Sequence, residues 1–286
     1  MRRAIAISAF GLGSASPNPP VGCVVLDRHG AAVGEGYHRR KGESHAEVNA
    51  LHGAGARAAG GTAVVTLEPC NHHGRTPPCH QALIDAGVSR VLVALIDPTS
   101  RGEGGVARLR EAGVDVVVDV LADEARVVLG PWLGTLATSR PVVTWLYEHA
   151  ADGPRPVSVD LLARFRVGVD VVVGPGGLAG EGVAGAHAPD AFRIPSLPDH
   201  GALAELFANG ARSVLLHGEP GLRHLDDGLV DDVIVALPAS EPSSSGAMSP
   251  LPSGFVLEGV ERHAAGVLLR AHRTRDEAGS GHGSRR

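Results

Sequence analysis

The sequence contains only three cysteines and lacks any long apolar run. Cys23, Cys70 and Cys79 cannot form a disulfide framework for 286 residues, and a small, odd number of thiols suits a reducing compartment. No stretch approaches the ~20 apolar residues that a membrane span requires. These features exclude a disulfide-stapled fold and a membrane-spanning protein. We expect a cytoplasmic protein whose cysteines bind metal, react or fill the core.

Positive charge is scarce as well, because Lys41 is the single lysine and 26 basic residues face 31 acidic ones. The formal net charge of -5 gives no field that would concentrate a polyanion. We therefore expect a small-molecule partner, with no nucleic acid and no membrane. The content of 43% apolar and 20% charged residues is typical of a globular protein long enough for two domains.

The first 16 residues imitate a secretory signal peptide, with two arginines, a short apolar run and small residues after it. The run is broken by glycines, and Asn18 close behind it belongs to the site described below. A first helix is therefore the better interpretation.

Apolar runs alternate with helix-like stretches, which predicts an α/β layered fold. The expected strands of the first half are 21–26, 63–67, 91–96 and 114–120, and its expected helices are 46–53, 80–86 and 106–112. One more helix is expected over 123–139, which Gly130-Pro131 should kink or break. After Arg140-Pro141, apolar runs at 142–146, 169–173, 214–216 and 233–237 indicate a second α/β segment. We expect domains at 1–139 and 140–286, with a loop over 241–250 and a disordered tail from 276.

The strongest chemical signal is His45-Ala46-Glu47, followed by Cys70 and Cys79. One imidazole and two thiolates suit Zn²⁺ and leave the fourth tetrahedral position open for water. A carboxylate beside that water, outside the metal's coordination sphere, can move protons to a leaving group, and Glu47 fits this role. This set is the signature of zinc nucleobase deaminases. The alternative, a structural zinc or two buried cysteines near an unrelated histidine, would leave the flanking prolines and Glu47 as coincidences.

The two cysteines are separated by a longer loop than in the usual Cys-x-x-Cys. Residues 69–79 match Pro-Cys-x-His-x-Gly-(Lys or Arg)-Thr-Pro-Pro-Cys without a gap, and here the sequence resembles the deaminase domain of the bacterial bifunctional riboflavin-biosynthesis deaminase/reductase family. Ser16-Pro17-Asn18-Pro19, Gly36-Tyr37-His38 and Asp97-Pro98 resemble it too. The resemblance implies a cytidine deaminase-like three-layer α/β/α domain followed by a dihydrofolate-reductase-like α/β domain, which is shorter here.

The resemblance also implies roles for individual residues. It makes His45, Cys70 and Cys79 the zinc ligands and Glu47 the catalytic proton shuttle. Four further positions match residues that bind the pyrimidine, the ribose and, for the arginine, the ribose phosphate: Asn18, His38, His72 and Arg75. Without the family pattern, Asn18 could organise a turn, His38 could lie on the surface and Arg75 could be a solvated charge. We expect Cys23 to be a core thiol, and His52, His73 and His80 to be structural.

The resemblance fades in the second half. Arg140-Pro-Val-Val-Thr-Trp resembles the opening strand of the family's reductase domain, but the lysine that follows in the family is missing. Gly177 stands where the family has a threonine in its Val-Gly-x-Gly-Thr loop, and His217-Gly218-Glu219 replaces Glu-Gly-Gly. These losses favour a degenerate reductase-like domain with no NADPH and no cofactor-binding residues, retained for folding, dimerisation or substrate shape. An active but divergent reductase is the alternative.

The predicted reaction is the deamination of 2,5-diamino-6-(5-phosphoribosylamino)pyrimidin-4(3H)-one to 5-amino-6-(5-phosphoribosylamino)uracil. We expect a homodimer whose product passes to a separate reductase. Three alternatives remain: deamination of a related aminopyrimidine or pterin in a specialised pathway, a still bifunctional NADPH-dependent enzyme, and a non-catalytic binding subunit. The intact zinc set with Glu47 argues against a binding subunit, and the acidic balance argues against a tRNA deaminase.

Overall fold

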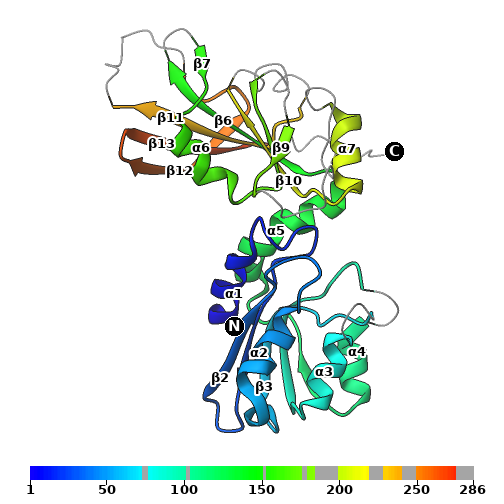
Figure 1. The fold of residues 1–286 in the computed structure, drawn as a ribbon. Coiled ribbons are helices and arrows are strands. Elements are labelled where there is room, and N and C mark those ends of the chain that lie inside the picture. The colour runs from blue at the N-terminus through cyan, green and yellow to red at the C-terminus, as the bar shows by residue number, and fades with distance from the viewer. Residues whose placement is uncertain are drawn as a thin grey trace, which may run out of the picture.

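The computed structural model describes residues 1–72, 77–100, 104–150, 153–175, 179–183, 199–218, 228–239 and 249–274. The chain forms two sheets with their own helices, one above the other in Figure 1. We call the part up to α5 the N-terminal domain and the part from β6 onward the C-terminal domain. No helix of the described residues has the length and apolar character needed to cross a membrane.

The N-terminal domain has a five-stranded sheet in the order β2-β1-β3-β4-β5. Its strands are β1 (Gly22–Leu26), β2 (Ala32–Tyr37), β3 (Thr62–Leu67), β4 (Arg90–Leu95) and β5 (Asp115–Val117). Strand β1 is antiparallel to both neighbours, whereas β3, β4 and β5 run parallel. Its helices are α1 (Arg2–Ser8), α2 (Ala46–Ala54), α3 (Cys79–Asp85), α4 (Gly104–Glu111) and α5 (Ala122–Thr138), with short 3₁₀ turns at Ala9–Gly11 and Gly55–Ala58.

Side chains of the strands alternate between the two faces of this sheet, and both faces are covered. Cys23 and Val25 point into a core formed with α2, α3 and α4. Val24 points the other way, into a core with α1. Helix α5 extends that second layer over β3 and β4 through Leu129 and Trp132. The result is the three-layer α/β/α arrangement expected from the sequence.

Two glycines of β2 allow α2 to lie directly on the strand. A Cβ atom at Gly34 would stand 2.1 Å from the carbonyl oxygen of Ala50, and one at Gly36 would stand 2.4 Å from that of Ala46. Any larger residue would push the helix outward, because its own backbone is the contact surface. This close packing fixes the N-terminal end of α2, where His45 and Glu47 lie.

Helix α5 runs unbroken through Pro131, so of the expected kink or break at Gly130-Pro131 the break is wrong. Trp132, on the next position, packs in the core and donates its Nε1–H to the carbonyl of Pro17 at 3.1 Å. Packing of the apolar face of α5 on the sheet compensates for the hydrogen bond that proline removes. The helix ends at Thr138 and leads into the second sheet.

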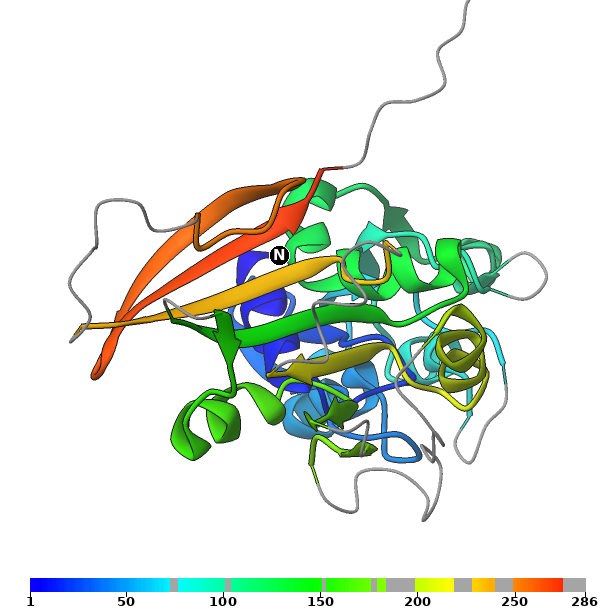
Figure 2. The same cartoon turned by 90° about the horizontal axis from the view of Figure 1, so that it is seen from above.

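The C-terminal domain is built on a sheet in the order β12-β13-β11-β6-β10-β8-β9, with β7 paired to β6 (Figure 2). Its strands are β6 (Val142–Ala150), β7 (Gly153–Arg155), β8 (Val171–Val173), β9 (Ala179–Glu181), β10 (Ser213–His217), β11 (Asp232–Pro238), β12 (Phe255–His263) and β13 (Gly266–Arg273). Helix α7 (His200–Ala208) packs on one face through Leu203 and Leu206. Helix α6 (Val159–Arg166) packs on the other through Leu161.

One buried carboxylate joins the two domains. Asp170, which is 1% exposed, lies before β8, and its Oδ2 accepts a hydrogen bond from the Ser16 hydroxyl at 3.1 Å. The same oxygen accepts the backbone N–H of Arg212 at 2.8 Å and both the N–H and the hydroxyl of Ser213 at 2.9 Å. The loop that carries Asn18 is therefore held by the C-terminal domain.

The expected elements of both halves are present, with several differences. Strand β5 covers only Asp115–Val117 of the expected 114–120, and β2 was not expected. The final hairpin of β12 and β13 was not expected either, since Phe255–His263 mixes apolar residues with exposed charged ones. The expected loop lies mostly, and the expected tail wholly, outside the described residues.

Candidate functional site

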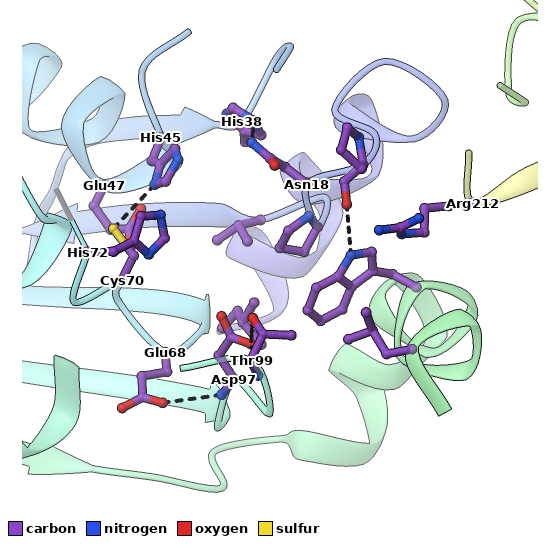
Figure 3. A pocket seen from close by; sticks show the side chains of 16 residues that line it. Asn18, His38, His45, Glu47, Glu68, Cys70, His72, Asp97, Thr99 and Arg212 are labelled. Carbon is purple, nitrogen blue, oxygen red and sulfur yellow. Dashed lines mark hydrogen bonds between the residues drawn. The ribbon is translucent and has the colours of Figure 1, made fainter. Parts of the chain in front are cut away.

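A cavity of about 270 Å³ opens at the carboxyl end of β3 and β4 and reaches the C-terminal domain. Its wall includes predicted site residues from three separate segments, namely Asn18, His38, His45, Glu47, Cys70 and His72. Figure 3 shows His45, Glu47, Cys70 and His72 gathered at one end and Arg212 at the opposite end.

His45, Cys70 and Cys79 bring one ligand atom each to within 4.8 Å of one another. His45 Nδ1 lies 3.6 Å from Cys70 Sγ and 3.3 Å from Cys79 Sγ. Zn–N bonds of about 2.0 Å and Zn–S bonds of about 2.3 Å in a tetrahedron would place nitrogen and sulfur about 3.5 Å apart. The observed spacing therefore fits a zinc ion held by these three side chains.

The surroundings favour the anionic form of the Cys70 sulfur, whereas its hydrogen bond to Cys70 and burial raise the pKa of the Cys79 thiol. Hydrogen bonds from Cys79 and His45 lower the pKa of Cys70 to about 3, although burial opposes them. The Cys79 backbone N–H also donates to Cys70 Sγ at 3.3 Å. His80, expected to be structural, approaches the Cys70 carbonyl with Nδ1 at 3.1 Å and thereby supports the loop. A thiolate is the form that binds a metal.

Glu47 lies in the first turn of α2, two residues after His45, and is 3% exposed. Burial and the nearby Cys70 raise the pKa of its carboxyl to about 7. A carboxyl that titrates near neutral pH can both accept and donate a proton, which is the property that general acid–base catalysis requires.

Asn18 and His38 form one hydrogen-bonded unit. His38 is 2% exposed, and its Nδ1 donates to the carbonyl of Ser44 at 3.2 Å. Its Nε2 is therefore the acceptor of the neutral ring and takes the Asn18 amide N–H at 3.0 Å. Burial lowers the pKa of His38, which keeps the ring neutral. His38 thus orients Asn18, and both residues line the cavity (Figure 3).

His72 and Arg75 are the other two predicted substrate contacts. His72 is exposed at the cavity mouth, with its ring 6.4 Å from that of His45. Arg75 lies outside the described residues. Cys23 is fully buried in the core between the sheet and α2, as expected for a packed thiol.

Several cavity residues were missed from sequence. Glu68, next to Pro69-Cys70, accepts hydrogen bonds from the backbone N–H of Asp97 at 3.3 Å and of Val106 at 3.0 Å. Its position directly before Pro69-Cys70 is the sequence feature that could have placed Glu68 in the cavity wall. Trp132 and Arg212 also line the cavity, and they lie too far along the chain for any local pattern to link them to the zinc residues.

Comparisons with known proteins agree with this geometry. Residues 1–95 match the family model for the cytidine and deoxycytidylate deaminase zinc-binding region. The chain is 46% identical over 127 residues to the diaminohydroxyphosphoribosylamino-pyrimidine deaminase of Buchnera aphidicola from Schizaphis graminum, covering 86% of that protein and 44% of this chain. The chain belongs to the diaminohydroxyphosphoribosylaminopyrimidine deaminase family.

Longer relatives of the diaminohydroxyphosphoribosylaminopyrimidine deaminase family are matched in part. The riboflavin biosynthesis protein RibD of Escherichia coli is 47% identical over 154 residues, which are 54% of this chain and 42% of that protein. The chain therefore matches less than half the length of that relative.

Similarity of fold extends further than similarity of sequence. A Thermotoga maritima diaminohydroxyphosphoribosylaminopyrimidine deaminase/5-amino-6-(5-phosphoribosylamino)uracil reductase has a TM-score of 0.75 at 25% identity, over 96% of this chain and 97% of that chain. The expected fold, a deaminase domain followed by a reductase-like domain, is confirmed.

Proposed function

We propose that this protein is a zinc-dependent deaminase that removes the 2-amino group of 2,5-diamino-6-(5-phosphoribosylamino)pyrimidin-4(3H)-one. The supporting observation is that a His-Cys-Cys ligand set, a buried carboxylate and an oriented amide line one cavity. The similarity to a diaminohydroxyphosphoribosylamino-pyrimidine deaminase from Buchnera aphidicola supports this substrate, and the similarity to a riboflavin biosynthesis protein from Escherichia coli supports the same pathway.

His45, Cys70 and Cys79 would hold the zinc ion, and their donor chemistry and spacing fit it. Bound zinc acidifies a water molecule and so supplies the nucleophile at neutral pH. The side chains then have to position the ring and move protons, because the C–N bond breaks only if the amino group leaves as ammonia.

Glu47 performs the proton transfers. It takes a proton from the attacking water and gives it to the ring nitrogen beside C2 as the C–O bond forms. It then passes the second water proton to the amino group, so that the C–N bond breaks, ammonia leaves and a carbonyl remains at C2. The pKa of about 7 suits a group that alternates between these two states.

The pyrimidine and ribose would be contacted by Asn18, with His38 fixing its orientation, and by His72 at the mouth of the cavity. Arg75 remains the predicted contact for the ribose phosphate. An arginine suits that role because its planar fork can donate two hydrogen bonds to a phosphate.

We further propose that the C-terminal domain, from residue 140 onward, has lost reductase activity. Ligands of open α/β sheets bind at the carboxyl ends of the strands. There, a Cβ atom at Gly174 would stand 3.0 Å from His217 Nε2, so the imidazole lies directly against the backbone at the end of β8. Trp145 is fully buried and donates to the Gly218 carbonyl at 2.7 Å. This packing, the missing lysine after the opening strand and Gly177 in place of the family's threonine support a lost reductase site. A separate reductase would then act on the product of a homodimeric deaminase.

The test is ammonia release from the diaminopyrimidine ribotide by purified protein of known zinc content, with NADPH absorbance recorded in the same cuvette. We expect ammonia release without NADPH oxidation. Chelation should abolish the release, and added Zn²⁺ should restore it. Oxidation of NADPH with the deaminated product would show that the reductase is active. No ammonia from fully zinc-loaded protein would show that the ribotide is not the substrate.

A further inference from the structure

One cation from the C-terminal domain lines the cavity that holds the zinc residues. Arg212 follows α7 and precedes β10, and among the described residues it is the only arginine or lysine in the cavity wall. Figure 3 shows it entering at the end opposite His45, beside the Asn18 loop and α5. The cavity therefore has the zinc residues at one end and a guanidinium at the other.

The guanidinium is held in place by its own domain. Nη1 donates to the carbonyls of Phe207 at 3.0 Å and Ala211 at 2.9 Å. The guanidinium carbon lies 4.1 Å from the centre of the Phe207 ring. The backbone N–H is bound to Asp170, the carboxylate that also holds Ser16. A cation fixed in this way loses little conformational freedom when it binds a ligand.

Part of the donor edge is left without a partner. Nε is buried and makes no hydrogen bond within the described part of the chain. No carboxylate of the described residues forms an ion pair with this guanidinium, unlike Arg140, which pairs with Asp231. Burial also lowers the pKa of Arg212, because desolvation disfavours the charged form, and the charge of the nearby Asp170 opposes this shift only in part. A desolvated cation with unused donors is stabilised by an anion that brings its own acceptors.

We propose that Arg212 is a phosphate-binding residue of the deaminase site, so that the C-terminal domain completes the substrate pocket. This inference rests on the proposed ribotide substrate, whose ring would face Glu47 while its phosphate extends toward Arg212. It explains how a domain without reductase activity still contributes to the deaminase. Arg75, predicted from sequence as a phosphate contact, serves as the competing candidate in the test.

The test compares the ribotide with its dephosphorylated riboside, using zinc-loaded full-length protein. We expect Arg212→Gln to raise KM for the ribotide by roughly 10- to 100-fold and to leave kcat within about twofold, since a charge-assisted hydrogen bond is lost. For the riboside, kcat/KM should not change. Arg212→Lys keeps the charge and should raise KM for the ribotide less than Arg212→Gln does. An equal loss on both compounds, or an unchanged KM for the ribotide, would overturn the proposal.

Arg164→Gln is the matched control, because it removes the same charge from the same domain. Arg164 is exposed, pairs with Glu261 and lies outside the cavity wall, so both compounds should be turned over as by the unaltered protein. Arg75→Gln provides the comparison with the competing candidate. If Arg75→Gln abolishes the preference for the ribotide while Arg212→Gln retains it, the phosphate is not bound by Arg212.

A binding measurement keeps this inference separate from the proposed reaction. Ribose 5-phosphate is titrated calorimetrically into each zinc-loaded protein, with ribose as the probe that lacks phosphate. We expect Arg212→Gln to weaken binding of ribose 5-phosphate at least tenfold, whereas Arg164→Gln has no effect. Equal binding by Arg212→Gln overturns the subsite, even if the ribotide is deaminated. Binding through Arg212 without any deamination supports the subsite and contradicts only the proposed reaction.

Discussion

Glu47 combines two features that single side chains rarely share, a fully buried position and a place beside three potential metal ligands. Replacing it with glutamine keeps the shape and the hydrogen-bonding capacity but removes the ability to exchange protons. We expect Glu47→Gln to retain zinc and to lower kcat by about 10²- to 10⁴-fold. Metal analysis and ammonia release on the same sample measure both quantities. Glu43→Gln, at an exposed position of the preceding loop, should change neither, and a fully active Glu47→Gln protein would refute the role of Glu47.

His38 acts through Asn18, and this makes it a positioning residue. Its Nδ1 donates to Ser44 and its Nε2 accepts from Asn18, so glutamine, whose amide has both an NH₂ donor group and an oxygen acceptor, can replace both bonds. We expect His38→Ala to raise KM roughly three- to tenfold with a smaller change in kcat, since one oriented hydrogen bond is lost. His38→Gln should recover most of the loss. A purely structural role would instead lower the active fraction and leave KM of the remaining enzyme unchanged.

At the scale of elements, the packing of α2 on β2 controls where the zinc residues lie. Gly34→Ala would force its Cβ against the Ala50 carbonyl, whereas a Cβ at Gly53, within α2, would stand an ordinary 3.6 Å from Gly34. We expect Gly34→Ala to destabilise the protein by about 1–3 kcal/mol and to weaken zinc binding, because α2 shifts. Gly53→Ala should stabilise it by about 0.5–1 kcal/mol, because alanine favours a helix. Thermal unfolding and zinc titration measure both; equal stability of the two variants would contradict the packing argument.

The same packing explains which elements could be predicted from sequence. Strands β1, β3 and β4 are apolar runs buried on both faces, so composition alone predicts them. Strand β2 contains the glycines that its contact with α2 requires, and glycine is depleted in strands, so its sequence resembles a loop. Helix α5 tolerates Pro131 because tertiary packing outweighs the local preference of proline against a helix. A sequence pattern carries no information on that packing.

The predictability of the site follows a similar division. His45, Glu47, Cys70 and Cys79 come from two short segments whose spacing reflects one helix start and one loop, so a motif identifies them. Arg212 reaches the cavity only because the two domains pack together, and no local pattern encodes that contact. The hydrogen bonds of His38 fix its tautomer and let it orient Asn18, which no sequence pattern indicates, while its predicted contact with the substrate stays a prediction.

The stability of the whole molecule should depend on pH through Asp232, at the start of β11. Burial, with Asp231 and Glu258 nearby, raises the pKa of its carboxyl to about 6. The folded state therefore binds this proton more tightly than the unfolded chain, and the stabilisation is complete below about pH 4 and lost as the pH rises through 6. Asp232→Asn should then stabilise the protein by about 1–2 kcal/mol at pH 8 and by almost nothing at pH 4. Denaturant unfolding at both pH values tests this, and Glu205→Gln, at an exposed site on α7, should show no such dependence.

The two domains meet at the Asp170 carboxylate, which binds the loop that carries Asn18 and the backbone of Arg212. Ser16, two residues before Asn18, donates its hydroxyl to Asp170 Oδ2. The backbone N–H of Arg212 donates to the same oxygen. If the C-terminal domain holds the Asn18 loop in place, loss of the Ser16 hydrogen bond should weaken substrate binding more than it slows the chemical step. We expect Ser16→Ala to raise KM about two- to fivefold, to leave kcat nearly unchanged and to cost about 0.5–1.5 kcal/mol of stability.

Asp170→Ala should be far more damaging, because the buried N–H groups of Arg212 and Ser213 would lose their acceptor as well. We expect it to cost about 3–5 kcal/mol of stability, because each buried donor that loses its acceptor costs about 1–3 kcal/mol. Ser14→Ala is the matched control for Ser16→Ala, because among the described residues the Ser14 hydroxyl donates to the Gly11 carbonyl alone, at 3.4 Å. Steady-state kinetics and thermal unfolding of the three variants separate the effects. If Ser16→Ala and Ser14→Ala have the same KM as the unaltered protein, the C-terminal domain does not act on the substrate through the Asn18 loop, and Arg212 would be its sole contribution to the cavity.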